Sequence, residues 1–489
     1  MPSDPSLILH PQPPIQFGTD GWRGIIAKDF TFERLVRVAP IAAQVLEQTY
    51  GESATQRLIV IGYDRRFLSE EFAQATAAAV QQAGYDVLLA NTYAPTPALS
   101  WAAKHHHALG ALVITASHNP GIYSGLKVKG VFGGSVPPAV TQVIQDTLAA
   151  GSAPLFSGTP GHLEEFDPWP DYCQVLQSKV DIERINQAIT QGQLTVFVDV
   201  MHGATAGGLQ RLLSAPVQEL NGDRDPLFAG GAPEPLPKYL GQLIQTLQAQ
   251  QNRSGSAAVV GFIFDGDGDR IAAMDGQGQF LSSQILIPIL IEHLAARRQF
   301  QGEVIKTISG SELIPKVAAL YQLPVHETPI GYKYIADRML ATAAVLLGGE
   351  ESGGIGYGNH IPERDGLLSA LYLLEAAAQS GKDFTQLYQQ LQTQTGYTSF
   401  YDRIDLPLAS EADSVRLIQH LQTSPFTQVL DQAVTNVLSV DGFKFSLADH
   451  SWLLIRFSGT EPVLRLYCES HQPDRVAQIL AWAKDWALS

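Results

Sequence analysis

The sequence predicts an α/β protein of several domains, with a smaller α+β domain at its carboxyl end. Its 489 residues are too many for one hydrophobic core and fit three or four domains. Through most of the chain, short apolar segments alternate with helical segments rich in Ala, Gln and Leu, which is the pattern of parallel α/β sheets. Near the end, residues 452–457 and 463–469 instead read as two strands around a Ser-Gly-Thr-Glu-Pro loop, and residues 475–488 read as a helix. This last segment therefore predicts the smaller domain.

The apolar segments give the expected strands in chain order. They are residues 58–63, 87–90, 111–115, 195–200, 259–264, 304–308 and 343–347. Helices are expected between them; one, residues 69–83, should begin with Ser69 as its N-cap and with early acidic residues. Ligands of such sheets bind at the carboxyl ends of strands, and the unusual polar segments fall there.

Composition excludes several classes of protein. The chain is 45% hydrophobic and 16% charged, and its net charge of −16 argues against binding nucleic acid or an anionic membrane. Its two cysteines, Cys173 and Cys468, do not form a disulfide framework, so we expect a reducing compartment, the cytoplasm. The first residues lack the pattern of a signal peptide. The longest apolar run, residues 285–291, is too short to span a bilayer.

Three carboxylates on alternate residues, Asp265, Asp267 and Asp269, directly follow an apolar strand. Like charges this close repel, and a bound divalent cation removes that repulsion. Oxygen ligands favour Mg²⁺ or Ca²⁺, and the glycines between the aspartates allow a tight wrap around an ion. The alternative is a solvated acidic turn.

The acidic segment does not fit an EF-hand. That loop needs Gly at its sixth position and Glu at its twelfth, where this chain has Arg270 and Gly276. An arginine that ends the acidic run indicates an anion, such as phosphate, beside the metal.

Residues 115–120 (TASHNP) follow another predicted strand. Ser117 with His118 and Asn119 suits a nucleophile that has an acid or base beside it. A simple Ser/Asn turn is the alternative. A Ser-His-Asp hydrolase is disfavoured because adjacent Ser and His cannot easily form that triad and no Gly-x-Ser-x-Gly elbow is present.

Three further polar segments complete the set. Residues 348–354 (GGEESGG) contain two carboxylates and a hydroxyl flanked by flexible glycines. This combination suits recognition of vicinal sugar hydroxyls, and the alternative is an ordinary Gly-rich turn. Arg456 and Arg465 flank a Ser-Gly-Thr turn that can hold a phosphate. Residues 17–24 (FGTDGWRG) form a Gly-rich loop that is a weak signal alone.

Together, and in this order, the five segments resemble the α-D-phosphohexomutase superfamily. The resemblance spans nearly the whole chain through residues 19–24, 115–120, 265–270, 349–353 and 456–465. It implies four domains around a central cleft, three of them related α/β units with mixed sheets. It also implies a phosphoserine enzyme that moves phosphate between the 1- and 6-hydroxyls of a hexose.

The resemblance also implies roles for individual residues. Ser117 matches the phosphorylated serine, with Arg23, His118 and Lys127 as basic groups around the reacting centre. The matched metal ligands are the Ser117 phosphate, Asp265, Asp267 and Asp269. The matched substrate-binding residues are Thr19, Arg270, Gly331, Lys333, Glu350, Ser352, Arg456, Ser458, Gly459, Thr460 and Arg465. One departure is Ser124, where the family often has Asn; Lys127 is kept, so we expect changed hydrogen bonding there without lost chemistry.

From the resemblance we expect four domains with defined ranges. They are a phosphoserine-loop domain (1–165), a metal-binding domain (166–276), a sugar-recognition domain (277–395) and a phosphate-binding α+β domain (396–489). The expected cofactor is Mg²⁺, with catalytic amounts of a hexose 1,6-bisphosphate as activator. The expected partner is a phosphosugar, without nucleic acid or membrane, and the protein is expected to be a monomer or a weak homodimer.

Residues 350–352 (EES) followed by Gly resemble glucose-preferring members, which favours a phosphoglucomutase. The alternatives are a phosphomannomutase, a phosphoglucosamine mutase, a dual-specificity enzyme, or a glucose-1,6-bisphosphate synthase that uses a bisphosphate donor. Two readings outside these mutases are a non-catalytic sugar-phosphate sensor and a phosphatase with an aspartyl nucleophile. Retention of Ser117, the three aspartates and both loop arginines disfavours the sensor.

Overall fold

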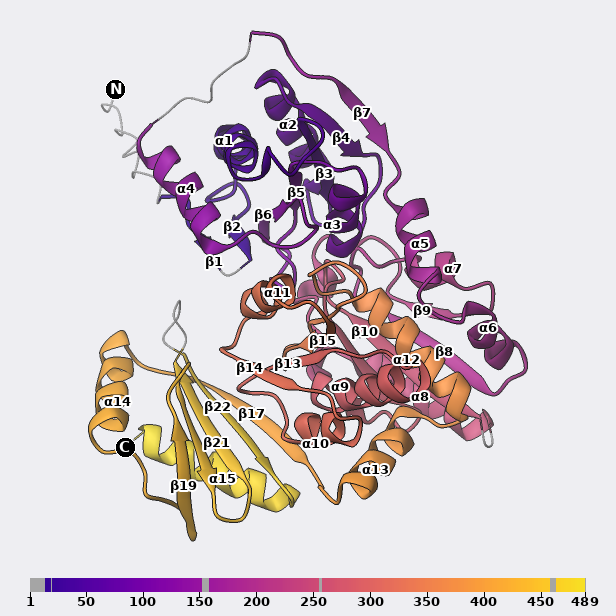
Figure 1. Cartoon of the computed structure of the whole chain (residues 1–489), viewed down its shortest axis with the longest axis vertical. Coiled ribbons are helices and arrows are strands. Elements are labelled where there is room, and N and C mark those ends of the chain that lie inside the picture. Colours follow the sequence, from indigo (N-terminus) through magenta and orange to yellow (C-terminus); the bar gives the residue numbers. More distant parts are fainter. Residues whose placement is uncertain (1–13, 19, 152–157, 255–256, 458–462, 489) are drawn as a thin grey trace, which may run out of the picture. The chain divides into compact units, whose positions relative to one another are not determined.

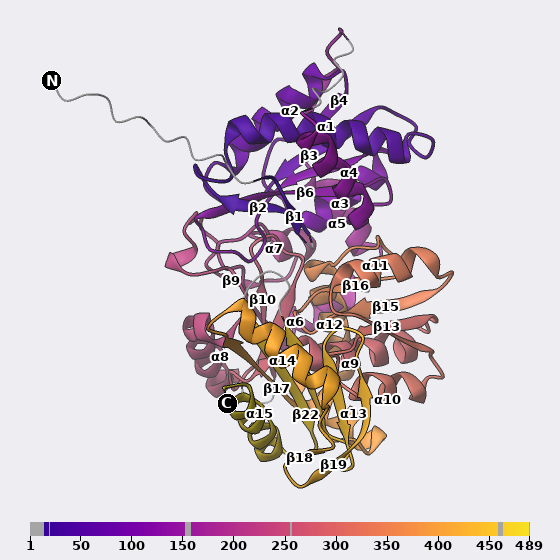
Figure 2. The same cartoon turned by 90° about the vertical axis from the view of Figure 1, so that its left-hand side faces the viewer.

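The computed structural model describes residues 14–18, 20–151, 158–254, 257–457 and 463–488. The chain forms two compact units, one of residues 1–279 with 360–371 and the other of residues 280–359 with 372–489 (Figures 1 and 2). Each unit contains two sheets, and each is described separately below.

The first unit begins with a mixed sheet in the order β1-β2-β6-β5-β3-β4-β7. Its strands β3, β4, β5 and β7 are parallel, whereas β6, β2 and β1 continue the sheet in antiparallel pairs. The sheet is therefore mixed, which confirms the mixed sheets that the resemblance implies. The strands are β1 (Phe17–Gly18), β2 (Gly21–Ile25), β3 (Leu58–Tyr63), β4 (Asp86–Ala90), β5 (Gly110–Ile114), β6 (Tyr123–Gly130) and β7 (Leu163–Phe166).

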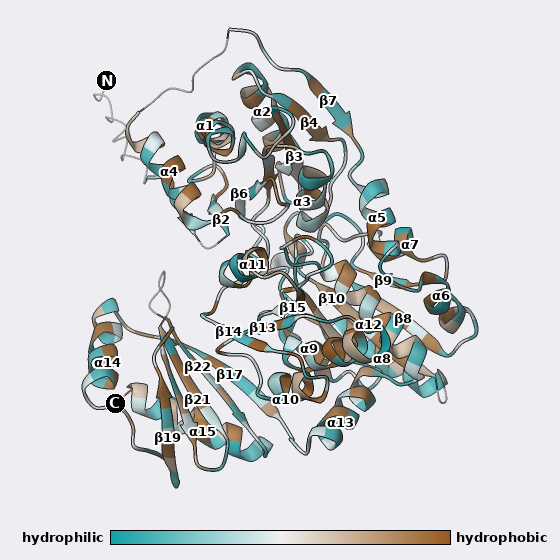
Figure 3. Ribbon diagram, in the orientation of Figure 1, coloured by the Kyte–Doolittle hydropathy of each residue, from teal (hydrophilic) through white to brown (hydrophobic). Residues whose placement is uncertain are grey.

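Helices cover both faces of this sheet because its strands are apolar on both sides. The helices α1 (Phe32–Tyr50), α2 (Ser69–Gln82) and α4 (Pro138–Ala149) share one core with Ile59 and Leu112. Helix α3 (Thr96–His105) packs on the other face at Gly62, where a Cβ would lie 2.2 Å from Leu99. Helices such as α1 and α14 (Glu411–Thr423) carry alternating hydrophilic and hydrophobic bands (Figure 3), as expected when one side of a helix faces a sheet.

The predicted N-cap of α2 is wrong. Leu68 occupies the cap position with a left-handed backbone, and Ser69 is the first helical residue. The Ser69 hydroxyl instead donates to Asp64 Oδ1 (2.7 Å). The Ser69 hydroxyl therefore binds the buried carboxylate of Asp64, which follows β3, and does not cap the backbone of α2.

The strands of the second sheet that belong to this unit run in the order β11-β10-β8-β9. Strands β9, β8 and β10 are parallel and β11 is antiparallel to β10. The elements are α5 (Trp169–Gln177), α6 (Ile182–Thr190), β8 (Leu194–Asp199), α7 (Gly208–Leu212), β9 (Gln218–Leu220), η1 (Phe228–Gly230), η2 (Pro237–Tyr239), α8 (Gly241–Ser254), β10 (Ala258–Phe264) and β11 (Ile271–Asp275).

The second unit contains a four-stranded sheet in the order β14-β13-β15-β16. The strands β14, β13 and β15 are parallel, and β16 is antiparallel to β15. Helix α12 begins in the first unit and continues in the second. The elements are β12 (Phe280–Leu281), α9 (Ser283–Glu292), η3 (His293–Arg297), β13 (Glu303–Thr307), α10 (Leu313–Leu320), β14 (Val325–Thr328), α11 (Tyr332–Ala341), β15 (Val345–Gly349), β16 (Ile355–Tyr357), α12 (Gly366–Ser380) and α13 (Phe384–Thr395).

The last sheet is antiparallel throughout, in the order β17-β22-β21-β20-β19-β18. This confirms the predicted α+β character of the carboxyl end. The elements are β17 (Phe400–Pro407), β18 (Gln428–Val429), β19 (Gln432–Leu438), β20 (Phe443–Leu447), β21 (Trp452–Phe457), β22 (Val463–Ser470) and α15 (Pro473–Leu488), together with α14.

The structure also bears on the cysteines and on membrane-spanning helices. Cys173 and Cys468 are both buried and form no disulfide. Among the described residues, no helix is both long enough and apolar enough to cross a membrane.

Candidate active site

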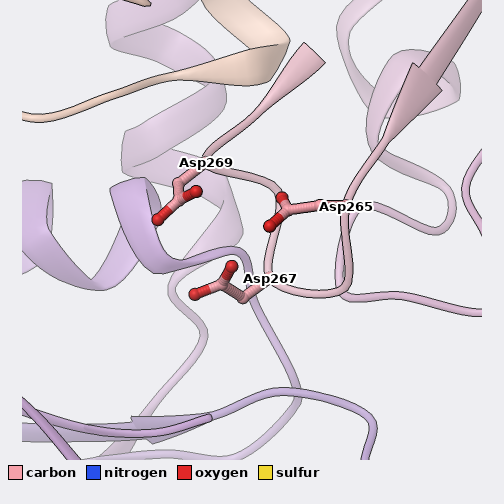
Figure 4. A group of neighbouring side chains, drawn as sticks. All are labelled: Asp265, Asp267 and Asp269. Carbon is pink, nitrogen blue, oxygen red and sulfur yellow. The ribbon is translucent and has the colours of Figure 1, made fainter. Parts of the chain in front are cut away.

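The three predicted metal ligands lie in the turn between β10 and β11. Asp265, Asp267 and Asp269 are completely buried, and their ligand atoms lie within 4.8 Å of one another. Figure 4 shows the carboxylates gathered around a common point on the inside of the turn. The acidic segment is therefore a compact buried site, which excludes a solvated turn.

Backbone hydrogen bonds hold this turn in place. The carbonyls of Gly266, Asp267 and Gly268 accept from backbone N–H groups of Ala204 (2.9 Å), Thr96 (2.8 Å) and Gly366 (3.2 Å), respectively. The turn thus has fixed contacts on three sides.

The turn needs glycine at two positions, at Gly266 because another backbone lies close to it and at Gly268 because of its backbone conformation. We call residues 265–270 the metal turn and residues 115–120 the serine loop. A Cβ on Gly266 would lie 2.4 Å from the carbonyl oxygen of Ser117, so the backbones of these two segments lie directly against each other. Gly268 has φ of +72°, a left-handed conformation that glycine adopts without strain.

Two buried cations neutralise part of the acidic turn. Lys127 Nζ lies 2.8 Å from Asp267 Oδ2, 2.8 Å from Asp269 Oδ2 and 2.7 Å from Asp20 Oδ2. Arg364 Nη2 lies 2.6 Å from both Asp20 Oδ2 and Asp269 Oδ2. Burial opposes the charge of Lys127, but Asp20, Asp267 and Asp269 outweigh it and raise the pKa of the lysine. Lys127 is therefore a firmly charged group.

The remaining carboxylate oxygens fit a hard divalent cation. Asp267 Oδ1 and Asp269 Oδ1 are buried and accept no hydrogen bond from any residue in the described ranges. Burial, followed by the charges of Asp269 and Asp267, raises the pKa of Asp265 well above its ordinary value. Unpartnered oxygens and a carboxyl that resists ionisation are both relieved by a bound cation. The residues present therefore fit Mg²⁺.

Ser117 lies beside the metal turn, after the end of β5. Its backbone is left-handed (φ 51°), and its N–H donates to Thr115 Oγ1 (2.9 Å). Its hydroxyl donates to Asp265 Oδ2 (2.9 Å), and His118 Nδ1 lies 3.3 Å from the same hydroxyl. The predicted nucleophile, its neighbouring base and a metal ligand thus meet in one place.

A completely buried arginine, Arg66, fixes the serine loop. Its guanidinium donates to the carbonyls of Ser117, Asn119 (2.7 Å), Pro120 (3.0 Å) and Tyr123 (3.1 Å). Because one rigid planar group holds four carbonyls, the loop has little freedom to move.

The other predicted groups of this centre also lie close by. Arg23 Nη1 donates to Asn119 Oδ1 (2.6 Å), and the Arg270 backbone N–H donates to Asp265 Oδ1 (3.1 Å). Burial, together with the charges of Arg270 and Arg23, lowers the pKa of His118 well below its ordinary value.

The predicted sugar-binding loop lies in the second unit, after β15. Glu350 is buried, and the buried hydroxyl of Ser352 has no hydrogen-bond partner among the residues that are described. Glu351 accepts instead from Ser309 Oγ (2.5 Å) and Thr307 Oγ1 (3.3 Å). These bonds fix the loop and leave the Ser352 hydroxyl available for a ligand.

Two further predictions concern the start of α11. Gly331 precedes this helix with φ of 128°, and Lys333 lies on its first turn with Nζ 4.8 Å from the ring centre of Tyr334. Both residues belong to the second unit.

The two predicted phosphate-binding arginines face each other across adjacent strands. Arg456 on β21 pairs in register with Arg465 on β22. Arg456 Nε lies 3.1 Å from both carboxylate oxygens of Asp441, and Arg465 Nε is buried with no hydrogen-bond partner in the described part of the chain. The other predicted substrate-binding residues, Thr19, Ser458, Gly459 and Thr460, lie outside the described residues.

Sequence reasoning missed four residues of the first unit. Asp20 and Arg364 pair with the metal-turn cluster, Thr96 donates to Asp267 Oδ2 (2.6 Å), and Arg66 holds the serine loop. Asp20 lies within the Gly-rich segment that the sequence singles out, and Arg364 stands in a charged run just before an apolar helix. Thr96 and Arg66 carry no comparable signal.

Known proteins match this chain over most of its length. Four domain families of phosphoglucomutase/phosphomannomutase match in order: alpha/beta/alpha domain I over residues 14–154, domain II over 170–278, domain III over 282–395 and the C-terminal domain over 417–483.

Individual relatives are named as mutases of hexose phosphates as well. A phosphoglucomutase/phosphomannomutase from Thermococcus kodakarensis is 28% identical over 468 residues, which is 95% of this chain and 96% of the relative. A phosphoglucosamine mutase from Halorhodospira halophila is 29% identical over 475 residues, or 95% of each. A crystal structure from Thermus thermophilus, described as a phosphomannomutase, is 30% identical with a TM-score of 0.83 and covers 98% of this chain and 100% of its own. This chain therefore belongs to the phosphoglucomutase/phosphomannomutase family within the α-D-phosphohexomutase superfamily, and it is an isomerase-class phosphotransferase.

Proposed function

We propose that this protein is a phosphoglucomutase, which interconverts glucose 1-phosphate and glucose 6-phosphate through phosphoserine 117 and a 1,6-bisphosphate intermediate. The observation that carries the proposal is the contact of the Ser117 hydroxyl with Asp265, 2.9 Å away, at the edge of the buried aspartate cluster. A nucleophile at this position can transfer a phosphoryl group beside a divalent cation.

The chemistry demands concentrated positive charge. Phosphoryl transfer passes through a loose transition state with charge spread over three oxygens. When held by Asp265, Asp267, Asp269 and the phosphoserine, Mg²⁺ would neutralise part of that charge. The firmly charged Lys127, fixed by three carboxylates, supplies more from the protein itself.

We assign the proton transfer to His118. Two basic side chains are candidates for this role, and their pKa values are shifted in opposite directions: that of His118 is lowered and that of Lys127 is raised. A base must be unprotonated to accept a proton from a sugar hydroxyl. His118 therefore accepts and returns that proton, and Lys127 acts as a fixed charge.

The proposed cycle has two balanced transfers. In the first, the bond between Ser117 Oγ and phosphorus breaks, the free hydroxyl of the hexose monophosphate bonds to phosphorus, and its proton passes to His118. In the second, the other phosphate of the bisphosphate returns to Ser117 and the proton returns to the sugar oxygen. Arg456 and Arg465 bind the phosphate that is not reacting, so they must accept either end of the bisphosphate. A trace of hexose 1,6-bisphosphate rephosphorylates Ser117 and so activates the enzyme.

Glucose is the proposed sugar because residues 350–352 carry Glu-Glu-Ser. The support is the Ser352 hydroxyl, which no described residue hydrogen-bonds, together with the buried Glu350 two residues before it; a hydroxyl and a carboxylate suit adjacent sugar hydroxyls. The relatives carry the names of several sugar phosphates, so mannose and glucosamine phosphates are the alternatives to test. We also propose that residues 1–165, 166–276, 277–395 and 396–489 are the four domains that supply these groups.

The test is product analysis by ³¹P NMR. The protein is incubated with Mg²⁺, glucose 1-phosphate and a trace of glucose 1,6-bisphosphate, alongside the Ser117→Ala variant. We expect glucose 6-phosphate to appear with the wild-type protein and not with the variant. Undiminished turnover by Ser117→Ala would overturn the phosphoserine mechanism. Turnover of mannose or glucosamine phosphate alone would overturn the glucose assignment, and net release of bisphosphate from a bisphosphate donor would indicate a synthase.

A further inference from the structure

The carboxyl-terminal sheet has two different faces. One face, with Leu453 and Leu464, is covered by the helices α14 and α15. The other carries Trp452, Leu454 and Tyr467, which pack against Ile308 within the same unit. The second face is the one from which the two predicted phosphate-binding arginines project.

Strand register places a third arginine on that face. Arg465 pairs with Arg456 on one side and with Asp405 on the other, and Tyr467 pairs with Arg403. Paired residues of an antiparallel sheet point to the same side, as do residues two apart on one strand. Arg403, Arg456 and Arg465 therefore share one face, although only the last two belong to the segment that the sequence singles out.

Arg403, like Arg456, pairs with a nearby carboxylate. Its guanidinium lies over the Tyr467 ring, 5.8 Å from the ring centre, and its Nη2 donates to Asp405 Oδ2 (3.0 Å). A guanidinium has five N–H donors, so one carboxylate partner fixes the group and leaves donors for a second anion. The side chain is 31% exposed, so an anion can reach it from solvent.

Two buried donors on this face lack a hydrogen-bond partner within the described ranges. The Tyr467 hydroxyl and Arg465 Nε are both buried, and neither makes a hydrogen bond to any described residue. Burial and the charge of Glu351 raise the pKa of Tyr467, so its hydroxyl keeps its proton and can donate. Unpartnered buried donors among three arginines are the arrangement that an anion completes.

We propose that Arg403, seated on Tyr467, is a third phosphate-binding arginine of this protein, and that the Tyr467 hydroxyl is a further donor to the same anion. The ligand is the non-reacting phosphate monoester of a hexose phosphate, and this identification rests on the function proposed above. Donors spread along the sheet suit a phosphate that must be held in two orientations of the sugar.

The test uses Arg403→Met, which removes the charge and keeps a long apolar stem over the ring. The KM for the hexose phosphate that the wild-type protein turns over should rise about 10- to 100-fold, the loss expected for a hydrogen bond to a charged group. The kcat should stay within about threefold, because the non-reacting phosphate is bound alike in ground and transition states. An unchanged KM would overturn the proposal.

The matched control is Arg416→Met. Arg416 is an exposed arginine on α14, the helix that covers the opposite face, and its substitution changes the net charge equally. If Arg416→Met raises KM as much as Arg403→Met, the effect is one of overall charge and the proposal fails. If Arg403→Met does not fold, Arg403→Lys keeps charge and stem but loses the bidentate fork, and its KM should still rise severalfold.

A calorimetric titration with inorganic phosphate separates this proposal from the proposed function. It requires no turnover, so it can be read even if glucose phosphates are not substrates. We expect Arg403→Met and Arg456→Met to weaken phosphate binding and Arg416→Met to leave it unchanged. Phosphate binding that falls in Arg456→Met but not in Arg403→Met would refute the role of Arg403 while leaving the mutase assignment intact.

Discussion

Replacing Gly266 with alanine tests whether contact between two backbones sets the position of the nucleophile. The new Cβ would lie 2.4 Å from the Ser117 carbonyl oxygen and 2.8 Å from Pro233 Cγ. Cβ atoms essentially never approach a heavy atom closer than 3.0 Å, so the distance to Ser117 must lengthen from 2.4 Å to beyond 3.0 Å. The shift must displace the metal turn, the serine loop or both, and each of these segments is held by hydrogen bonds to other parts of the unit.

This displacement acts directly on the reacting atoms. It separates the Ser117 hydroxyl from Asp265, which are 2.9 Å apart in the native protein. A misplacement of about 1 Å can lower a rate by roughly 100-fold, and overpacking of a buried contact destabilises a protein by about 1–3 kcal/mol. We therefore expect Gly266→Ala to fold, to unfold at a slightly lower temperature, and to lose about 100-fold in kcat.

The assay is steady-state mutase turnover with saturating bisphosphate, beside a thermal unfolding curve. Gly241→Ala is the matched control, since a Cβ at Gly241 meets nothing within 4 Å. Its kcat should equal that of the wild-type protein. A Gly266→Ala enzyme that retains kcat within threefold would refute the view that this backbone contact positions Ser117.

Two further predictions concern the partly buried carboxylates Asp20 and Glu312. Asp20→Asn removes one of the three carboxylates that hold Lys127; Asp20 Oδ2 lies 2.7 Å from Lys127 Nζ. We expect kcat to fall about 10- to 100-fold and KM to change less. Equal changes in kcat and KM would contradict a positioning role for Asp20. Burial opposes the charge of Glu312, but Lys306 and Lys444 outweigh it and lower the pKa of Glu312. Its stabilising effect is therefore complete above the unfolded pKa of about 4.3 and is lost as the pH falls through the lower folded pKa. The difference in unfolding temperature between wild type and Glu312→Gln should be constant above about pH 5 and shrink in more acidic solution, and a difference that grows there would contradict the assignment.

Apolar runs predicted the central strands because burial on both faces leaves a continuous signal. The strand predicted at 58–63 is β3 (Leu58–Tyr63), and the strand predicted at 259–264 begins one residue early as β10 (Ala258–Phe264). The metal turn was predictable for the related reason that three alternate carboxylates are too costly to bury without a cation. By contrast, β17 (Phe400–Pro407) was not predicted, because most of its residues are exposed or half-buried and it lacks a clean apolar alternation.

Partners supplied by distant segments could not be predicted. Arg364 Nη2 lies 2.6 Å from Asp20, which is 344 residues away in the sequence, and no local pattern encodes that pairing. The role of Arg66 could not be predicted for the same reason. It holds the serine loop through four carbonyls that come together only in the folded chain. Sequence patterns predicted candidate reacting groups, whereas several residues that hold those groups in place appeared only in the structure.

The rigidity of the serine loop constrains how the reaction can proceed. Ser117 has a left-handed backbone, its carbonyl is held by Arg66 and it abuts Gly266, so it cannot swing to meet two different oxygen atoms of one sugar. A mutase must nevertheless exchange phosphate with two hydroxyls on opposite ends of the hexose. In the proposed cycle, the bisphosphate would therefore turn around while Ser117 stays still, and the groups proposed to bind the non-reacting phosphate would have to accept both orientations. Arginines on a sheet face meet this demand better than a single fixed contact, because each can donate in several directions to a phosphate whose position differs between the two half-reactions.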